Sequence, residues 1–398
     1  MHQFYSRIFE VLLCSFTAKS FQFNLLLHDS IKMIQLAANE GYISVLAAGK
    51  VRIDPCINGE MSERRRFVVS TVRRMLEEGN FRGRDVVSCL PNDKLKITSL
   101  RLAESEGEET ERALRKEVSQ RFGLDPDRDT INYVLAGNVR QDDEIKNELI
   151  LFAADNESIK SHIELLEDAG LKPVGIDTLP CALFRSFERS LRRQEDKERS
   201  SVFIDVGSRF TTVVFGRGRE ISFVKQILIG GEKFNQEIAA KLGVSRDAAS
   251  GLRERLRMER SGNAERGICE PGQDSMGQGD LDASTRQVMV DAVSSVAEEL
   301  AREISLCFRY YTVTFRGRRV ERAVFSGGEA YERILLNVLR RQLAVEIEVA
   351  QPLKGFDMMN VNFDSDRRGL LCEWAVAVGL SLKGWDGAIA KSEGAQTQ

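Results

Sequence analysis

One succession of predicted elements occurs twice in this chain, and the repeat constrains its fold more than any other feature. Apolar runs bounded by turn residues predict three strands near the start, at 23–27, 31–37 and 42–47. The same order of strand, tight turn, strand, turn and strand returns further along, at 202–205, 211–215 and 220–228. An internal repeat of this kind predicts two homologous lobes.

The segment between the two repeats has a different order of elements. Residues 93–172 predict strand, helix, strand, strand and helix, which is the length of a small α+β insertion. Its first helix, 108–122, places Leu114, Val118 and Phe122 on one face. The 398 residues have room for both lobes and this insertion, since a domain takes about 100–200 residues.

Composition argues against several classes of protein. The 57 Lys and Arg residues are balanced by 60 Asp and Glu residues, so an overall basic field for nucleic acid is absent. Three scattered histidines and seven cysteines without a CxxC pair disfavour a zinc centre and indicate buried thiols in a reducing compartment. The apolar run 11–16 is too short to span a membrane. We expect residues 1–22 to be a disordered leader and 388–398 a disordered tail.

The second repeat carries a pattern typical of phosphate binding. Asp205 ends a predicted strand, Gly207 follows in the turn, and Thr211 and Thr212 open the next strand. Such a hairpin places backbone N–H groups and hydroxyls around a phosphate, while the carboxylate holds hydrated Mg²⁺. An ordinary β-hairpin is the alternative, because Asp-x-Gly also occurs by chance in sheets.

Two further glycine pairs follow predicted strands, Gly230 with Gly231 and Gly327 with Gly328. At the second pair a buried strand runs through Ser326 into a helix start. Glycines there let the backbone approach a ligand closely, and the helix N–H groups can point at it. A tight strand-to-helix turn without a ligand is the alternative.

The order of these pieces and the duplicated lobes resemble the actin-like ATPase superfamily. The closer resemblance is to the PilM family of type IV pilus assembly proteins, with the cell-division protein FtsA as a relative. It covers about 23–385 and rests on stretches such as LLLHDSIKMIQL at 25–36, VFIDVGSRFTTV at 202–213 and AVFSGG at 323–328, with others at 164–183, 229–232, 303–311 and 375–382. The resemblance implies an α/β fold in which two RNase H-like lobes flank a nucleotide cleft, with an FtsA-type 1C insertion.

The same resemblance implies a division of the chain. Lobe 1A takes 23–92 and 173–199, and the insertion 93–172 corresponds to 1C. Lobe 2A takes 200–231 and 301–369, and 232–300 corresponds to 2B. The helix in 370–387 closes the chain on lobe 1A.

The resemblance also implies a site for ATP and Mg²⁺, with Asp205 at the metal position. The nucleotide-binding positions that it carries over are Ser30, Lys32, Asp205, Gly207, Thr211, Thr212, Gly230, Gly231, Glu303, Ser326, Gly327 and Gly328.

Three pieces depart from the family pattern. Leu25 and Leu27 stand where the first phosphate hairpin has its Mg²⁺-holding aspartate and its glycine. Leu179 replaces an acidic residue that orients the attacking water in related ATPases, and an Ala-Glu-x-x-Lys helix retains only its basic residue, at Arg253. A sequence error would explain Leu25 but not the other losses. Because phosphoryl transfer depends on positioning and charge, these losses disfavour an active enzyme.

Two functions from different classes follow. The first is a cytoplasmic scaffold of a type IV pilus or type II secretion-like assembly machine, with ATP bound weakly or not at all. The alternative is an active ATPase or sugar-kinase-like phosphotransferase of the same superfamily. A sugar kinase needs an acidic base between the lobes, and the sequence identifies none.

The resemblance implies a partner as well. In the family, the cytoplasmic N-terminal tail of a bitopic, PilN-like inner-membrane protein docks between 1A and 1C, which implies a peripheral location at the inner membrane. Self-association is a further expectation. An extended peptide needs an apolar groove. Candidate wall residues, with ordinary core packing as the alternative for each, are Leu95, Ile97, Leu100, Val134 and Leu149.

Overall fold

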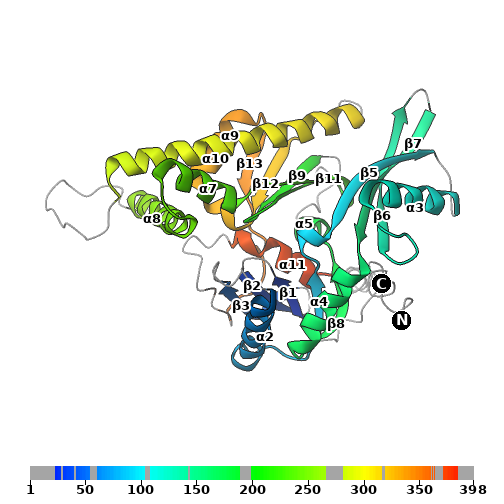
Figure 1. Ribbon diagram of the computed structural model, residues 1–398, viewed down its shortest axis with the longest axis horizontal. Coiled ribbons are helices and arrows are strands. Elements are labelled where there is room, and N and C mark those ends of the chain that lie inside the picture. Colours follow the sequence, from blue (N-terminus) through cyan, green and yellow to red (C-terminus); the bar gives the residue numbers. More distant parts are fainter. Residues whose placement is uncertain are drawn as a thin grey trace, which may run out of the picture.

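The computed structural model describes residues 23–27, 30–39, 42–53, 61–103, 108–141, 144–188, 199–265, 281–315, 319–359, 361, 363 and 371–383. The expected leader 1–22 and tail 388–398 lie outside the described residues. Three sheets organise the described part of the chain, and Figure 1 shows the first below the second, with the third to one side.

The first sheet has the strand order β3-β2-β1-β4-β8. Its strands are β1 (Phe23–Leu27), β2 (Ser30–Asn39), β3 (Tyr42–Arg52), β4 (Asp85–Cys89) and β8 (Lys172–Asp177). The first three are antiparallel neighbours, whereas β4 runs parallel to β1 and β8 parallel to β4. Helix α2 (Met61–Glu78) packs Val68 and Val72 in one cluster with Ile31 and Met33, because alternate residues of β2 share a face.

The second sheet repeats this topology, with the strand order β11-β10-β9-β12-β13. Its strands are β9 (Ser200–Val206), β10 (Thr211–Arg217), β11 (Glu220–Ile227), β12 (Arg322–Ser326) and β13 (Glu346–Val349). Again three antiparallel strands are followed by two parallel ones. β9 and β10 are buried over nearly their whole length, which explains their continuous apolar runs. The predicted repeat is therefore present as two sheets of equal order.

The third sheet is antiparallel, in the order β5-β7-β6. Its strands are β5 (Lys96–Ala103), β6 (Thr130–Gln141) and β7 (Glu144–Ala154). Helix α3 (Glu108–Phe122) lies over it with Leu114 and Val118 packed in one cluster with Leu149. Ile150 and Phe152 lie on the opposite face of β7 and join the large core of the second sheet. The third sheet is thus sandwiched between α3 and the second lobe.

The remaining helices cover the sheets and return the chain to the first one. They are α4 (Asn156–Asp168), α5 (Leu179–Glu188), α7 (Gly231–Leu242), α8 (Arg246–Glu265), α9 (Ala283–Thr314), α10 (Arg333–Gln342) and α11 (Ala375–Ser381), with short 3-10 turns η2 (Asn92–Lys94), η3 (Gly328–Tyr331) and η4 (Cys372–Trp374). Figure 1 shows α9 running along the second lobe. The hydroxyl of Ser381 in α11 donates to the carbonyl of Ile34 at 3.4 Å, which fixes the end of the described chain to β2.

Candidate functional site

Three glycine-bearing segments meet at the carboxyl end of β9. The turn after β9 contacts the N-terminus of α7, where the N–H of Gly231 donates to the carbonyl of Gly207 at 3.0 Å. The end of β12 lies beside β9, with Ser326 paired to Asp205. Parallel strands β9 and β12 deliver their carboxyl ends to the same edge of the sheet, so the segments after them become neighbours. The structure thus brings together pieces that the sequence predicts one at a time.

Close backbone approach explains two of these glycines. A Cβ at Gly230 would lie 2.5 Å from the carbonyl oxygen of Ser208, and a Cβ at Gly327 would lie 2.8 Å from the carbonyl carbon of Val206. Gly327 also has a φ of 91°, a conformation that favours glycine. In contrast, a Cβ at Gly328 would have no described atom within 4 Å. The fold itself therefore requires Gly230 and Gly327, with or without a ligand.

The polar side chains of the second hairpin bond to other parts of the protein. The hydroxyl of Ser326 donates to the Asp205 carboxylate at 3.2 Å. Thr211 donates to the carbonyl of Ile229 at 2.7 Å, and the amide of Asn92 donates to the Thr212 hydroxyl at 3.4 Å. Both threonines are buried, whereas Asp205 is half-buried. Of these residues, Asp205 is the least buried.

Lys32 enters this region from the first lobe and is bonded to the closing segment. Its Nζ donates to the backbone carbonyl of Glu373 at 3.0 Å and lies 3.9 Å from the Glu373 carboxylate, which also accepts from Lys50 at 2.6 Å. Burial lowers the pKa of Lys32, although Glu373 and Asp205 oppose that shift by favouring its charged form. Ser30 is half-buried at the start of β2. Lys32, predicted as a nucleotide-binding position, is thus paired with a glutamate of this chain.

A buried cluster of four charges joins α8 to the segment after β12. The Arg253 and Arg257 guanidiniums both bond to the Glu329 carboxylate, and Nε of Arg257 donates to Glu332 at 2.9 Å. Arg253 also donates to the carbonyl of Gly231 at 3.2 Å. Burial would raise the pKa of Glu329, but Arg253 and Arg257 outweigh burial and hold it below its usual range. The cluster is internally neutral.

The sequence prediction included Arg253 as a retained basic residue and missed its three partners. Arg257 lies four residues after Arg253, and Glu332 three residues after Glu329, so each pair shares a helical or turn face. That spacing indicates two charged faces. It gives no sign that the faces lie opposite each other.

The position of the lost acidic residue is apolar and buried. Leu179 is 4% exposed and belongs to the large core. The nearby carboxylate of Asp177 accepts from Arg185 at 2.8 Å and lies 3.6 Å from Nζ of Lys383. Burial would raise the pKa of Asp177, but Lys383 and Arg185 lower it further than burial raises it. Asp177 is therefore a paired structural charge and does not replace the missing residue.

Glu303 comes from the long helix that packs against α7. It lies on α9, one turn before Cys307, and its charge adds to the burial that raises the pKa of the Cys307 thiol to about 11. Lys225 of β11 opposes this rise in pKa, because its positive charge favours the thiolate. The remaining predicted positions occupy the carboxyl end of β9, the two segments beside it and the start of β2. Leu25 lies on β1, where it pairs with Met33.

This arrangement fits a metal-bound nucleotide poorly. Asp205 is the single carboxylate of the second hairpin, and Leu25 of β1 stands where the family pattern has a second one. The buried cations Lys32 and Arg253 are already paired with carboxylates of the chain. A phosphate would have to compete with Glu373 and Glu329 for them, so the site holds little of the charge that hydrolysis requires.

The described residues form helices of different lengths and hydrophobic character. None of them combines the length and the apolar character required.

Comparison with known proteins identifies relatives of this chain. A family model described as type IV pilus assembly protein PilM matches residues 27–279. A solved chain of a PilM-PilN type IV pilus biogenesis complex is 21% identical, with a TM-score of 0.71, and the match covers 92% of this chain and 99% of that one. Ethanolamine utilization protein EutJ from Carboxydothermus hydrogenoformans is 11% identical, with a TM-score of 0.49 and coverage of 96% and 98%. None of the curated proteins compared matches the sequence. The first structural likeness confirms the predicted α/β, actin-like fold.

Proposed function

This chain belongs to the family of type IV pilus assembly protein PilM, and we propose that it acts as a cytoplasmic actin-like scaffold in a type IV pilus or type II secretion-like assembly machine. The observation that carries the scaffold proposal is the pairing of its buried cations. Lys32 is bonded to Glu373 and Arg253 to Glu329, so the charges that a nucleotide would use already hold parts of the fold together. Stability of such a fold does not depend on a ligand.

We propose that ATP binds weakly, that the binding does not depend on Mg²⁺, and that turnover is negligible. The hairpin with Asp205 and Gly207 keeps the family pattern, which supports residual binding. The leucines at 25, 27 and 179 supply none of the charge that orients hydrated metal or attacking water. Metal is then a minor contributor to affinity.

The test measures ATP affinity and turnover with Mg²⁺ and with a chelator, for the native chain and Asp205→Ala. We expect the substitution to change affinity by less than about tenfold, because a carboxylate that holds no metal contributes little to anion binding. Steady, Mg²⁺-dependent hydrolysis that Asp205→Ala abolishes would overturn the scaffold proposal and favour an active ATPase.

For the partner, we propose the cytoplasmic tail of a PilN-like, bitopic inner-membrane protein, docked against the third sheet. The named likeness to one chain of a PilM-PilN complex supports this choice. Leu95, Leu100 and Leu149 are 5% exposed or less, so these three candidates serve core packing. The open apolar side chains of β6 are Tyr133 and Leu135, 43% and 52% exposed. Such a partner would hold the chain at the inner membrane.

Deleting the insertion would be a poor test, because Ile150 and Phe152 pack into the core of the second lobe. A point variant is sharper. We expect Leu135→Glu to weaken binding of a synthetic tail peptide at least about tenfold, because it places a charge in an apolar contact. Val313→Glu is the matched control, since Val313 is 81% exposed on α9. Equal binding by the native chain and both variants would contradict docking on β6.

A further inference from the structure

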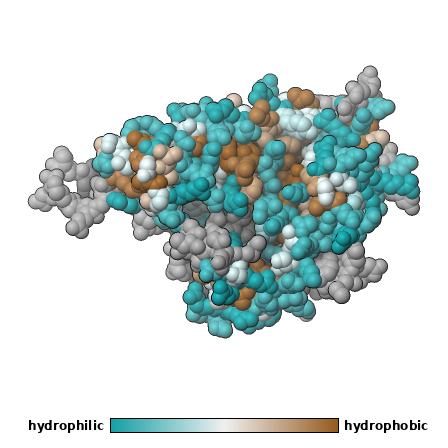
Figure 2. Space-filling view, in the orientation of Figure 1, coloured by the Kyte–Doolittle hydropathy of each residue, from teal (hydrophilic) through white to brown (hydrophobic). Residues whose placement is uncertain are grey.

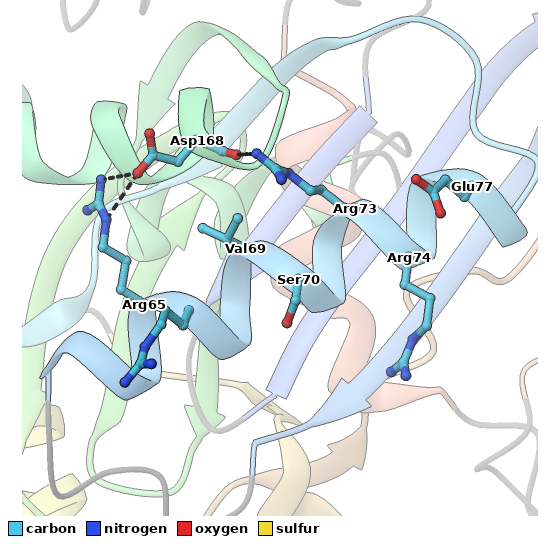
Figure 3. Close-up of a pocket in the computed structure, with 8 residues that line it drawn as sticks. Arg65, Val69, Ser70, Arg73, Arg74, Glu77 and Asp168 are labelled. Carbon is cyan, nitrogen blue, oxygen red and sulfur yellow. Dashed lines mark hydrogen bonds and ion pairs between the residues drawn. The ribbon is translucent and has the colours of Figure 1, made fainter.

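A groove lined with arginine lies on the outer side of the first lobe, between α2 and the end of α4 (Figure 3). Its volume is about 490 Å³. Four arginines line it, against two acidic residues, Glu77 and Asp168. The whole chain has a net charge of −3, so a cationic groove departs from the average charge of the molecule. An excess of positive charge in a groove attracts ligands that carry negative charge.

Two of the arginines are held by the end of α4. Arg65 donates through Nη2 and Nε to the carboxylate of Asp168, at 2.6 and 3.2 Å. Arg73 donates to the backbone carbonyl of Asp168 at 2.6 Å. Asp168 is the last residue of α4, where cations favour the negative end of the helix dipole. These contacts neutralise Asp168 and fix two side chains of the groove wall.

The other two arginines are directed outward. Arg66, Ser70 and Arg74 follow each other at four-residue spacing, so they share one face of α2, and all three are exposed. Figure 3 shows Arg74 extending away from Asp168. Within the described residues no hydrogen bond or ion pair engages Arg74, and Arg66 donates to the carbonyl of Ser62 at 3.5 Å. Two guanidiniums are thus available, separated by about 12 Å along the helix at 1.5 Å per residue.

The chemistry of this face selects among anionic ligands. A guanidinium forms paired hydrogen bonds with a carboxylate, and about 12 Å is the length of three to four extended residues. A lipid surface is a worse match, because none of the large exposed apolar side chains of the described residues lies on α2 or α4. Figure 2 shows this end of the molecule as mainly hydrophilic.

We propose that the α2 groove docks an acidic peptide segment of a partner protein, with carboxylates three to four residues apart on Arg66 and Arg74. This surface and its partner are separate from the β6 surface and from the tail peptide proposed above. The fixed Arg65 and Arg73 form the wall, and the two outward arginines supply the contacts that recognise charge.

The experiment measures fluorescence anisotropy of a labelled octaglutamate peptide with the full chain, at low and high salt, with an octalysine peptide as the opposite-charge probe. We expect Arg66→Glu/Arg74→Glu to weaken octaglutamate binding by about tenfold or more, since two charge-assisted contacts become repulsive. Arg302→Glu/Arg309→Glu is the matched control, because both arginines are exposed on α9 at similar spacing. The control should bind like the native chain, and both doubles should keep the native melting temperature.

Three results would overturn the proposal. The native chain could fail to bind octaglutamate at low salt. The two double variants could lose binding equally, which would show a general charge effect. Finally, the native chain could float with vesicles of anionic phospholipid and lose flotation in the Arg66→Glu/Arg74→Glu variant without any peptide binding, which would assign the groove to a membrane surface.

Discussion

The two lobes share one topology, but their first hairpins differ in register. In the second lobe Asp205 lies opposite Thr212. Leu25 stands at the aspartate position of the first lobe, and counting the same seven residues onward reaches Lys32. Leu25 nevertheless lies opposite Met33, and Lys32 lies opposite Leu26. The first hairpin is therefore shifted by one residue, and side-chain direction alternates along a strand. The first hairpin therefore departs from the second in strand register as well as in its missing aspartate and glycine.

The neighbouring strands extend this comparison. Ser326 pairs with Asp205 in the second lobe, and Ser88 holds the equivalent place beside Leu25 in the first. The Ser326 hydroxyl donates to the Asp205 carboxylate at 3.2 Å, whereas the Ser88 hydroxyl lies 3.0 Å from Nε2 of His162 on α4. At this place the second lobe has a half-buried carboxylate. The first lobe has turned the same place into a buried internal contact.

The two lobes also differ at the residue that follows each serine, where a substitution should have the largest effect on stability. Gly327 follows Ser326, and Cys89 follows Ser88. We expect Gly327→Ala to destabilise the protein by about 3 kcal/mol or more, because its φ of 91° and ψ of 173° suit essentially glycine alone and its Cβ would overlap the backbone of Val206. Thermal unfolding followed by circular dichroism measures the loss.

Gly328→Ala is the matched control, one residue further along. Its Cβ would meet no described atom within 4 Å, and its φ is not positive, so its melting temperature should stay near the native value. If Gly327→Ala and Gly328→Ala have the same melting temperature, the claim that Gly327 closely approaches the backbone of β9 is contradicted.

The histidine that Ser88 contacts gives the first lobe a pH dependence. Burial lowers the pKa of His162 from 6.5 to about 4. The unfolded chain therefore binds a proton before the folded chain does, so stability is full above pH 6.5 and falls as the pH drops toward 4. At pH 5 we expect His162 to lower the unfolding free energy by about 2 kcal/mol, since one pKa unit corresponds to about 1.36 kcal/mol.

His162→Gln removes the titration and keeps a group that can bond to Ser88. We expect its unfolding free energy to fall less between pH 7 and pH 5 than that of the native chain, by about 2 kcal/mol. Denaturant unfolding at the two pH values measures both. If the unfolding free energy of the variant and of the native chain falls equally between pH 7 and pH 5, His162 is not buried in its neutral form.

Local patterns predicted much of this molecule and distant pairings did not. The helix 108–122 is α3 with the predicted bounds, because its apolar period is read from adjacent turns. The glycine turns around Asp205 also have local signals. The bonds from Lys32 to Glu373 and from Arg253 to Glu329 join residues 341 and 76 positions apart. Charged residues of both signs are abundant in the sequence, so no local pattern indicates which pair meets.

The smallest test compares the two serines themselves. Ser88→Ala removes a hydrogen bond from His162, a side chain 6% exposed, and leaving a buried polar group without that bond should cost about 1–2 kcal/mol. Ser326 is as fully buried as Ser88, but the Asp205 that it bonds is half-buried, so water can still solvate the carboxylate after Ser326→Ala and the cost should be about half as large or less. Unfolding of the two variants at pH 7, where His162 is neutral, measures the difference. A larger loss for Ser326→Ala would mean that Asp205 is the more enclosed group, and the second lobe would then resemble the first in having closed its polar site.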